Sequence, residues 1–113
     1  MSGYRLQPRV SAALEDIHRY STARWGEPRA DAYILGFFDL FERIASRDEL
    51  WRAIPADLRT TGFRSRYERH LVYWVPARDG TVIIFALLHE RMHQFERLND
   101  IVPDNDRADS DEP

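Results

Sequence analysis

The chain has 113 residues, 43% of them hydrophobic and 31% charged, and it contains no cysteine. This length and composition predict one globular domain with a single core, and they exclude disulfides and thiolate metal sites. The N-terminus lacks the apolar segment of a secretory signal, and the longest apolar run (82–88) is too short to span a bilayer. We therefore expect a cytoplasmic protein with no membrane partner.

Charge is distributed unevenly along the chain. Residues 1–98 carry 15 Arg against 13 acidic residues, whereas residues 99–113 carry one Arg against six. We predict a single domain over 1–98 and an acidic, disordered tail over 99–113. Every basic residue is arginine. Arginine suits bidentate contacts to phosphate and carboxylate, but a GC-rich coding bias gives the same composition, and the even spread of arginine over the body favours that bias.

The N-terminal half predicts one strand and two helices. Residues 4–6 alternate in character and stop at Pro8, which predicts a short strand at a sheet edge. Apolar residues then recur every three or four positions up to Gly26, and again from Pro28 onward. This spacing predicts an antiparallel helical hairpin that packs on the sheet. Gly36 lies within the second helix, where we expect it to let the first helix approach closely.

Residues 46–61 form a polar connection between the helices and the remaining strands. We expect a short helical turn near 48–52, because Pro55 prevents a longer helix. Trp51 is the large apolar residue of this segment, and we expect it to pin the connection to the core.

The C-terminal half predicts three strands and a short helix. Residues 63–67 read as a strand, and residues 71–75 and 82–88 read as a β-hairpin joined through Asp79-Gly80. The unbroken apolar run of the last strand has no polar face, so it should lie in mid-sheet with both sides covered. The predicted fold is an α+β domain of order β-α-α-β-β-β with a mainly antiparallel sheet. The spacing of three between apolar residues beyond the last strand predicts the short C-terminal helix, with Met92, Phe95 and Leu98.

The segment His89-Glu90-Arg91-Met92-His93 matches the H-E-x-x-H pattern of zinc proteases. In those enzymes the pattern lies on one helix, which places both imidazoles on the same face. Here it follows a predicted strand, and no third ligand follows it. We therefore interpret it as a strand-ending His, a solvated Glu-Arg pair, a core Met and a surface His. We predict no metal and no other cofactor.

A basic cluster is the second candidate site. Arg64 and Arg66 are two positions apart on a predicted strand, so they project from the same face. Such a cluster could hold an RNA phosphate with His89 as proton carrier, contact an acidic protein, or be a solvated sheet face. The members expected at the rim of the hairpin are Arg64, Arg66, Arg69, His70, His89 and Arg91.

Several segments in this order resemble the ParE branch of the RelE/ParE toxin superfamily. The resemblance covers about residues 4–98, and His93 departs from it because these toxins commonly carry Asp there. The segments that carry it are Arg24-Trp25-Gly26, the helix over 33–44, Phe63-Arg64-Ser65 leading into His70-Leu71-Val72-Tyr73, and Leu87 to Met92.

The resemblance implies the toxin of a type II toxin–antitoxin pair, which inhibits DNA gyrase and forms a hetero-oligomer with a ParD-like antitoxin. No sequence-specific binding of nucleic acid is implied. An amphipathic antitoxin helix would lie along the helical hairpin, and an extended segment would add to a strand edge. The residues expected to contact the target are Arg64, Arg66, His89, Arg91 and Met92. Those expected to contact the antitoxin are Leu14, Ile17, Tyr20, Trp25, Tyr33 and Phe37.

Two alternatives stay open. The RelE branch consists of ribosome-dependent mRNA endonucleases, and in this chain Arg64, Arg66 and His89 would be the catalytic candidates. The match to that branch is incomplete, because lysine is absent and no Tyr follows His89, so gyrase inhibition is the preferred hypothesis. The other alternative is an inactive interaction module.

Overall fold

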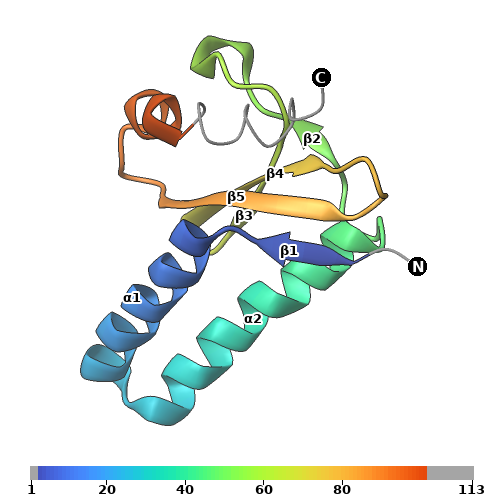
Figure 1. The fold of residues 1–113 in the computed structure, drawn as a ribbon. Coiled ribbons are helices and arrows are strands. Elements are labelled where there is room, and N and C mark those ends of the chain that lie inside the picture. Colours follow the sequence, from blue (N-terminus) through green and yellow to red (C-terminus); the bar gives the residue numbers. More distant parts are fainter. Residues whose placement is uncertain (1–2, 102–113) are drawn as a thin grey trace.

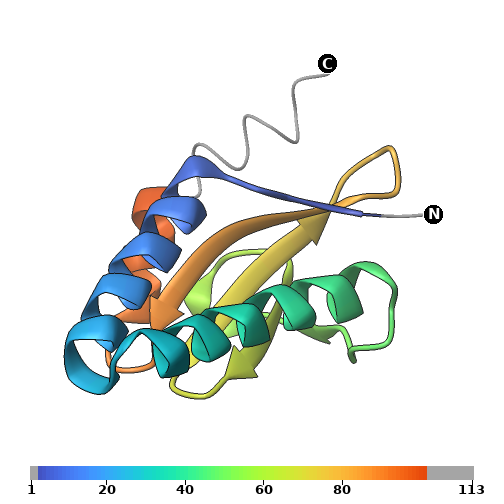
Figure 2. The same cartoon turned by 90° about the horizontal axis from the view of Figure 1, so that it is seen from below.

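Two helices pack on one face of a five-stranded sheet in the computed structural model of the chain, which describes residues 3–101 (Figure 1). Figure 2 views the domain from the side of the helices and shows both of them lying across that face. The elements in chain order are β1 (Tyr4–Leu6), α1 (Pro8–Trp25), α2 (Glu27–Ala45), β2 (Arg52–Ala53), a 3-10 turn η1 (Ala56–Leu58), β3 (Phe63–Tyr67), β4 (His70–Pro76), β5 (Val82–His89) and a C-terminal helix over residues 94–101.

The sheet has the order β1-β5-β4-β3-β2, with β1 parallel to β5 and every other pair antiparallel. The predicted α+β class, the edge position of the first strand and the β4–β5 hairpin are confirmed. Within residues 3–101, no helix combines the length and apolar character needed to cross a bilayer.

A single residue, Gly26, joins the two helices. Its φ of 95° lies in a region that glycine adopts more readily than other residues. Its N–H donates to the carbonyl of Thr22 at 2.9 Å, and its carbonyl accepts from the N–H of Ala30 at 3.1 Å. One glycine thus ends α1 and starts α2, which confirms the predicted helical hairpin.

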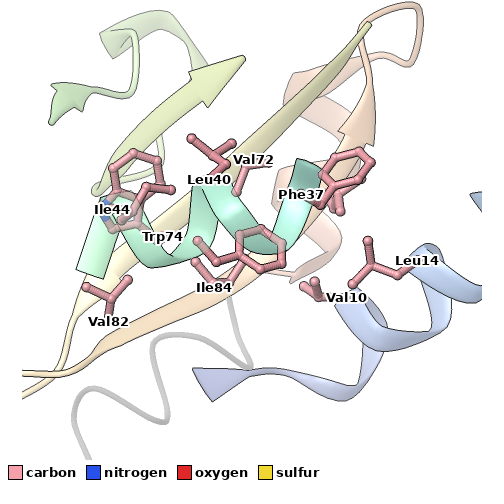
Figure 3. Close-up of a cluster of buried hydrophobic side chains, with 11 residues drawn as sticks. Val10, Leu14, Phe37, Leu40, Ile44, Val72, Trp74, Val82 and Ile84 are labelled. Carbon is pink, nitrogen blue, oxygen red and sulfur yellow. The ribbon is translucent and has the colours of Figure 1, made fainter. Parts of the chain in front are cut away.

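The two faces of the sheet have separate apolar cores, so the prediction of a single core is wrong. The helix-facing core lies between the sheet and the two helices (Figure 3) and consists of Val10, Leu14, Phe37, Leu40, Phe41, Ile44, Val72, Trp74, Val82, Ile84 and Leu87. The second core lies on the opposite face, under the C-terminal helix and the segment around η1, and consists of Ile54, Leu71, Tyr73, Val75, Ile83, Phe85, Ala86, Leu88, Leu98 and Ile101. β5 is therefore covered on both sides, as predicted.

A β-bulge explains how one strand supplies both cores without a regular alternation. Tyr73 pairs with Ala86, but the next residue, Trp74, pairs with Ile84, which leaves Phe85 as the extra residue of β5. Phe85 and Ala86 both belong to the second core, whereas Ile84 belongs to the helix-facing core. The extra residue bends the strand locally and shifts the side-chain alternation at that point.

The expected helical turn near 48–52 is wrong. Arg52 and Ala53 instead pair with Arg64 and Phe63 and form a fifth strand, β2. Tertiary pairing decides this segment, because a strand of two residues has no periodic signal of its own. The expectation for Trp51 is confirmed: its Nε1 donates to the carbonyl of Ile44 at 3.1 Å, and its ring contacts Phe63.

The expectation that Gly36 lets the first helix approach closely is also wrong, because the nearest atoms at this position belong to Tyr67. A Cβ at this position would lie 2.6 Å from Cζ of Tyr67 in β3, and closer still to its hydroxyl. The hydroxyl donates to the carbonyl of Tyr33 at 3.0 Å. Gly36 therefore makes room for a sheet tyrosine that bonds the backbone of α2.

The C-terminal helix covers residues 94–101 of the part of the chain that the structure describes. Leu98 and Ile101 are buried, whereas Met92 is 39% exposed and Phe95 44% exposed. The interpretation of Met92 as a core residue is therefore wrong. Met92 precedes the C-terminal helix and lies in the turn after β5. The remainder of the predicted acidic tail, residues 102–113, lies outside the described residues.

Candidate functional site

Arg64 and Arg66 project from the face of the sheet opposite the helices. Their cross-strand partners in β4 are Tyr73 and Leu71, which belong to the second core. Directly paired residues in a sheet point to the same side. The two arginines therefore share the face that also carries the C-terminal helix.

Glu90 connects this arginine face to the end of β5. Arg66 Nη1 donates to Glu90 Oε1 at 2.5 Å, and Arg69 Nη1 donates to Oε2 at 3.1 Å. The hydrogen bond from Arg66, together with that from Arg69, holds the pKa of Glu90 below its usual value. The interpretation of Glu90 as paired with the adjacent Arg91 is thus wrong, since its partners come from β3 and the turn after it.

His70 and His89 lie on the other face of the sheet, toward the helices. They pair across β4 and β5, and their rings are 5.1 Å apart between centroids. The hydroxyl of Tyr33 lies 3.3 Å from His70 Nδ1, and the ring of Phe37 packs edge-on against His70. Burial, with a contribution from the neighbouring His89, lowers the pKa of His70 to about 4, although Glu90 opposes the shift. His70 is therefore neutral at pH 7.

The predicted basic cluster is consequently divided by the sheet. Arg64 and Arg66 lie on one face, and the imidazole of His89 lies on the other. General acid–base cleavage requires the proton carrier to reach the group that the phosphate-binding residues hold. The described geometry does not bring these three side chains to one substrate.

The H-E-x-x-H pattern spans three different local structures. His89 ends β5, residues 90–92 form a turn, and His93 precedes the C-terminal helix. The two imidazoles therefore do not share one helical face, as a zinc-protease motif requires. Within residues 3–101, no group of three His, Cys, Asp or Glu side chains is arranged to hold a metal ion.

Gln94 fixes the turn that follows β5, and sequence reasoning missed it. Its Nε2 donates to the carbonyls of His89 and Met92 at 3.0 and 2.8 Å, and its Oε1 accepts from the hydroxyl of Tyr73 at 2.6 Å. The N–H of Arg91 donates to Nδ1 of His89 at 3.0 Å. These bonds hold a turn that exposes the side chains of Arg91 and Met92. No local pattern could have indicated Gln94, because its main partner is 21 residues away.

The residues predicted to contact an antitoxin differ in accessibility. Phe37 is fully buried in the helix-facing core of this structure. Tyr20 is 64% exposed and Trp25 38% exposed. Arg29 stacks on Trp25 at 4.5 Å, and Tyr33 packs edge-on against the same indole. Ile17, like Tyr33, is half-buried.

An open groove of about 460 Å³ runs between the two helices beside β1. Leu14, which is only 6% exposed, lies in its floor. Ile34 and Phe38 also line the groove, and both belong to the apolar stripe visible in the sequence. The stripe alone does not tell which of its members fill the core and which remain at the surface. The groove is lined by Leu6, Ser11, Leu14, Glu15, His18, Arg19, Ile34 and Phe38.

Comparison with known proteins shows which family the chain belongs to. A family model described as the ParE toxin of the type II toxin–antitoxin system parDE matches residues 4–94. The chain belongs to the ParE toxin family. It is thus the toxin component of a type II toxin–antitoxin system and has an antitoxin partner. In this ParE-family toxin the match ends at Gln94, so most of the C-terminal helix lies beyond the matched region.

Named relatives are similar over most of their length. Toxin ParE of Escherichia coli is 29% identical over 100 residues, which are 88% of this chain and 96% of that protein. Toxin ParE1 of Mycobacterium tuberculosis, in two strains, is 29% identical over 92 residues, which are 80% of this chain and 92% of that protein.

Proposed function

We propose that this ParE-family toxin inhibits DNA gyrase in the cytoplasm and that a ParD-like antitoxin neutralises it in a hetero-oligomer. The observation that carries the choice over RNA cleavage is the position of His89. Its imidazole lies on the opposite face of the sheet from Arg64 and Arg66. Inhibition through a contact surface needs no proton transfer, so this separation is no obstacle to it.

The proposed target surface joins the arginine face to the turn after β5. Glu90 links the two, because it accepts from Arg66 while Arg91 and Met92 follow it in the turn. Exposed arginine and a partly exposed methionine are residues enriched at protein interfaces. His89 contributes by holding the turn through its Nδ1 and its carbonyl, rather than by contacting the target.

The proposed antitoxin surface is the groove between α1 and α2. Its apolar floor and polar rim suit an amphipathic helix that inserts spaced apolar side chains. Ile34 and Phe38 line the groove and are only half-buried, so they join the predicted set. Tyr20 and Trp25 would extend the contact along the exposed helical surface.

A purified-gyrase assay tests the proposal. The folded toxin is titrated into gyrase with supercoiled or relaxed plasmid, and supercoiling and DNA cleavage are both measured. We expect loss of supercoiling together with accumulation of cleaved DNA. Arg91→Glu should weaken this inhibition at least tenfold, whereas Arg24→Glu, the same charge change at the end of α1, should leave it within about twofold.

Absence of any effect on gyrase from a folded sample would contradict the proposal. In that case, message cleavage on ribosomes would be measured for the native chain and for His89→Ala and Arg66→Ala. An inactive interaction module would instead be indicated if induction of the native chain caused no growth arrest.

A further inference from the structure

Two arginines face each other directly across β2 and β3. Arg52 is the register partner of Arg64 in this antiparallel pair. Like charges placed opposite each other in a sheet destabilise it. This pairing could not be predicted from local sequence patterns, because β2 is formed only by tertiary contact with β3.

No carboxylate compensates this pair within residues 3–101. Arg52 is exposed, and its side chain forms no ion pair or hydrogen bond with any of the residues that the structure describes. Arg64 donates a hydrogen bond to the hydroxyl of Tyr73 at 3.4 Å, and its guanidinium lies 5.9 Å from the centre of the Tyr73 ring. Tyr73 is neutral, so it does not compensate the charge of Arg64. The nearby Glu90 is already bonded to Arg66 and Arg69. The face therefore keeps an excess of positive charge.

We propose that Arg52, Arg64 and Arg66, here called the arginine row, bind the phosphodiester backbone of duplex DNA without reading its bases. Arg66 bonds Glu90 through Nη1, but its side chain is 57% exposed, so the guanidinium also remains accessible to a phosphate. An oxyanion between Arg52 and Arg64 would relieve their repulsion, and guanidinium groups bond phosphate oxygens in a planar, bidentate manner. Contact with Tyr73 orients the Arg64 side chain before the anion arrives.

The spacing of the row favours a regularly charged polymer. Arg64 and Arg66 are two positions apart in β3, or about 6.7 Å along the strand, and lie on the same face. DNA presents a negative charge at every nucleotide, so one strand can meet successive arginines. An acidic protein surface has no such regular repeat. The biological setting of this contact rests on the proposed function, since gyrase inhibition brings the toxin to a DNA-bound enzyme.

Fluorescence anisotropy with a labelled duplex of arbitrary sequence, over a series of salt concentrations, tests the inference. We expect the double variant Arg52→Gln/Arg64→Gln to bind about tenfold more weakly at low salt, as the loss of charge-assisted hydrogen bonds predicts. The slope of log affinity against log salt should fall by about 2, or about 0.9 for each phosphate contact removed.

The double variant Arg5→Gln/Arg19→Gln is the matched control. It removes the same charge from two exposed arginines that pair with Asp79 and Asp16, away from the arginine row. It should leave the salt slope unchanged. Arg52→Gln should not lower the melting temperature, because it removes a repulsion, and this serves as the check of folding.

An equal loss of DNA binding in both double variants would overturn the inference, as would binding of polyglutamate, but not DNA, through Arg52 and Arg64. The gyrase assay separates this inference from the proposed function. If gyrase is inhibited and DNA binding does not depend on the row, only the inference fails. If DNA binding depends on the row and gyrase is unaffected, the inference holds and the proposed function fails.

Discussion

The two faces of the sheet are built in different ways. The helix-facing side is covered by two long helices whose apolar stripes are visible in the sequence, and it buries most of the large aromatic side chains. The opposite side is covered by short segments from distant parts of the chain, around Ile54 and Leu98, and it leaves arginines at its margin. The first face supplies stability and the helical groove, whereas the second supplies the candidate target surface.

The largest expected effect lies in the helix-facing core. Phe37→Ala removes a fully buried ring that contacts Phe41, Tyr67 and His70. We expect a loss of about 3–5 kcal/mol in the free energy of unfolding, measured by urea denaturation. A loss below about 1 kcal/mol would mean that the helices do not anchor the fold as described.

Leu98→Ala tests whether the second face also has a real core. Leu98 is fully buried in the C-terminal helix, so its truncation should cost about 2–4 kcal/mol by the same measurement. Phe95→Ala in the same helix is the control, because Phe95 is 44% exposed and belongs to neither core, so its truncation should cost less than about 0.5 kcal/mol. Equal effects of the two changes would show that the helix does not pack through Leu98. A chain ending at Leu88 would lose this cover, and so it cannot be used to map the target surface.

Gly36→Ala tests the close contact between α2 and Tyr67 of β3. A methyl group here would overlap the ring of Tyr67, so we expect a loss of about 1–3 kcal/mol instead of the gain that alanine usually brings to a helix. Tyr67→Phe in the Gly36→Ala background removes the closest atom and should recover part of the loss in thermal denaturation. No recovery would indicate that the clash is with another group.

The smallest expected effect is a pH dependence from His70. Its pKa is about 4 in the folded protein and about 6.5 when unfolded, so the unfolded state binds more protons between these values. Stability should therefore be complete above about pH 6.5 and fall as the pH drops toward 4. Allowing for solvent screening of this half-buried ring, we expect about 1–2 kcal/mol. His70→Phe should flatten the curve of melting temperature against pH, and an unchanged curve would contradict the assignment.

Elements with a periodic signal could be predicted from local patterns in the sequence. The strand over 4–6, the helical hairpin around Gly26 and the β4–β5 hairpin were all predictable, because side-chain periodicity and turn residues are local properties. The resemblance to the ParE family also rested on local segments in a fixed order. The packing of Trp51 against the core was also predictable, because Trp51 is a large apolar residue in an otherwise polar connection.

The contacts between side chains depend instead on how distant segments pack together. Strand β2, the contact of Arg52 with Arg64, and the role of Gln94 all arise from pairings between distant residues, which no local pattern encodes. His89 could be placed at the end of a strand, but its face depends on the β-bulge at Phe85, which shifts the alternation of β5. The composition of the candidate site was thus visible in the sequence, whereas its division between two faces followed from strand register.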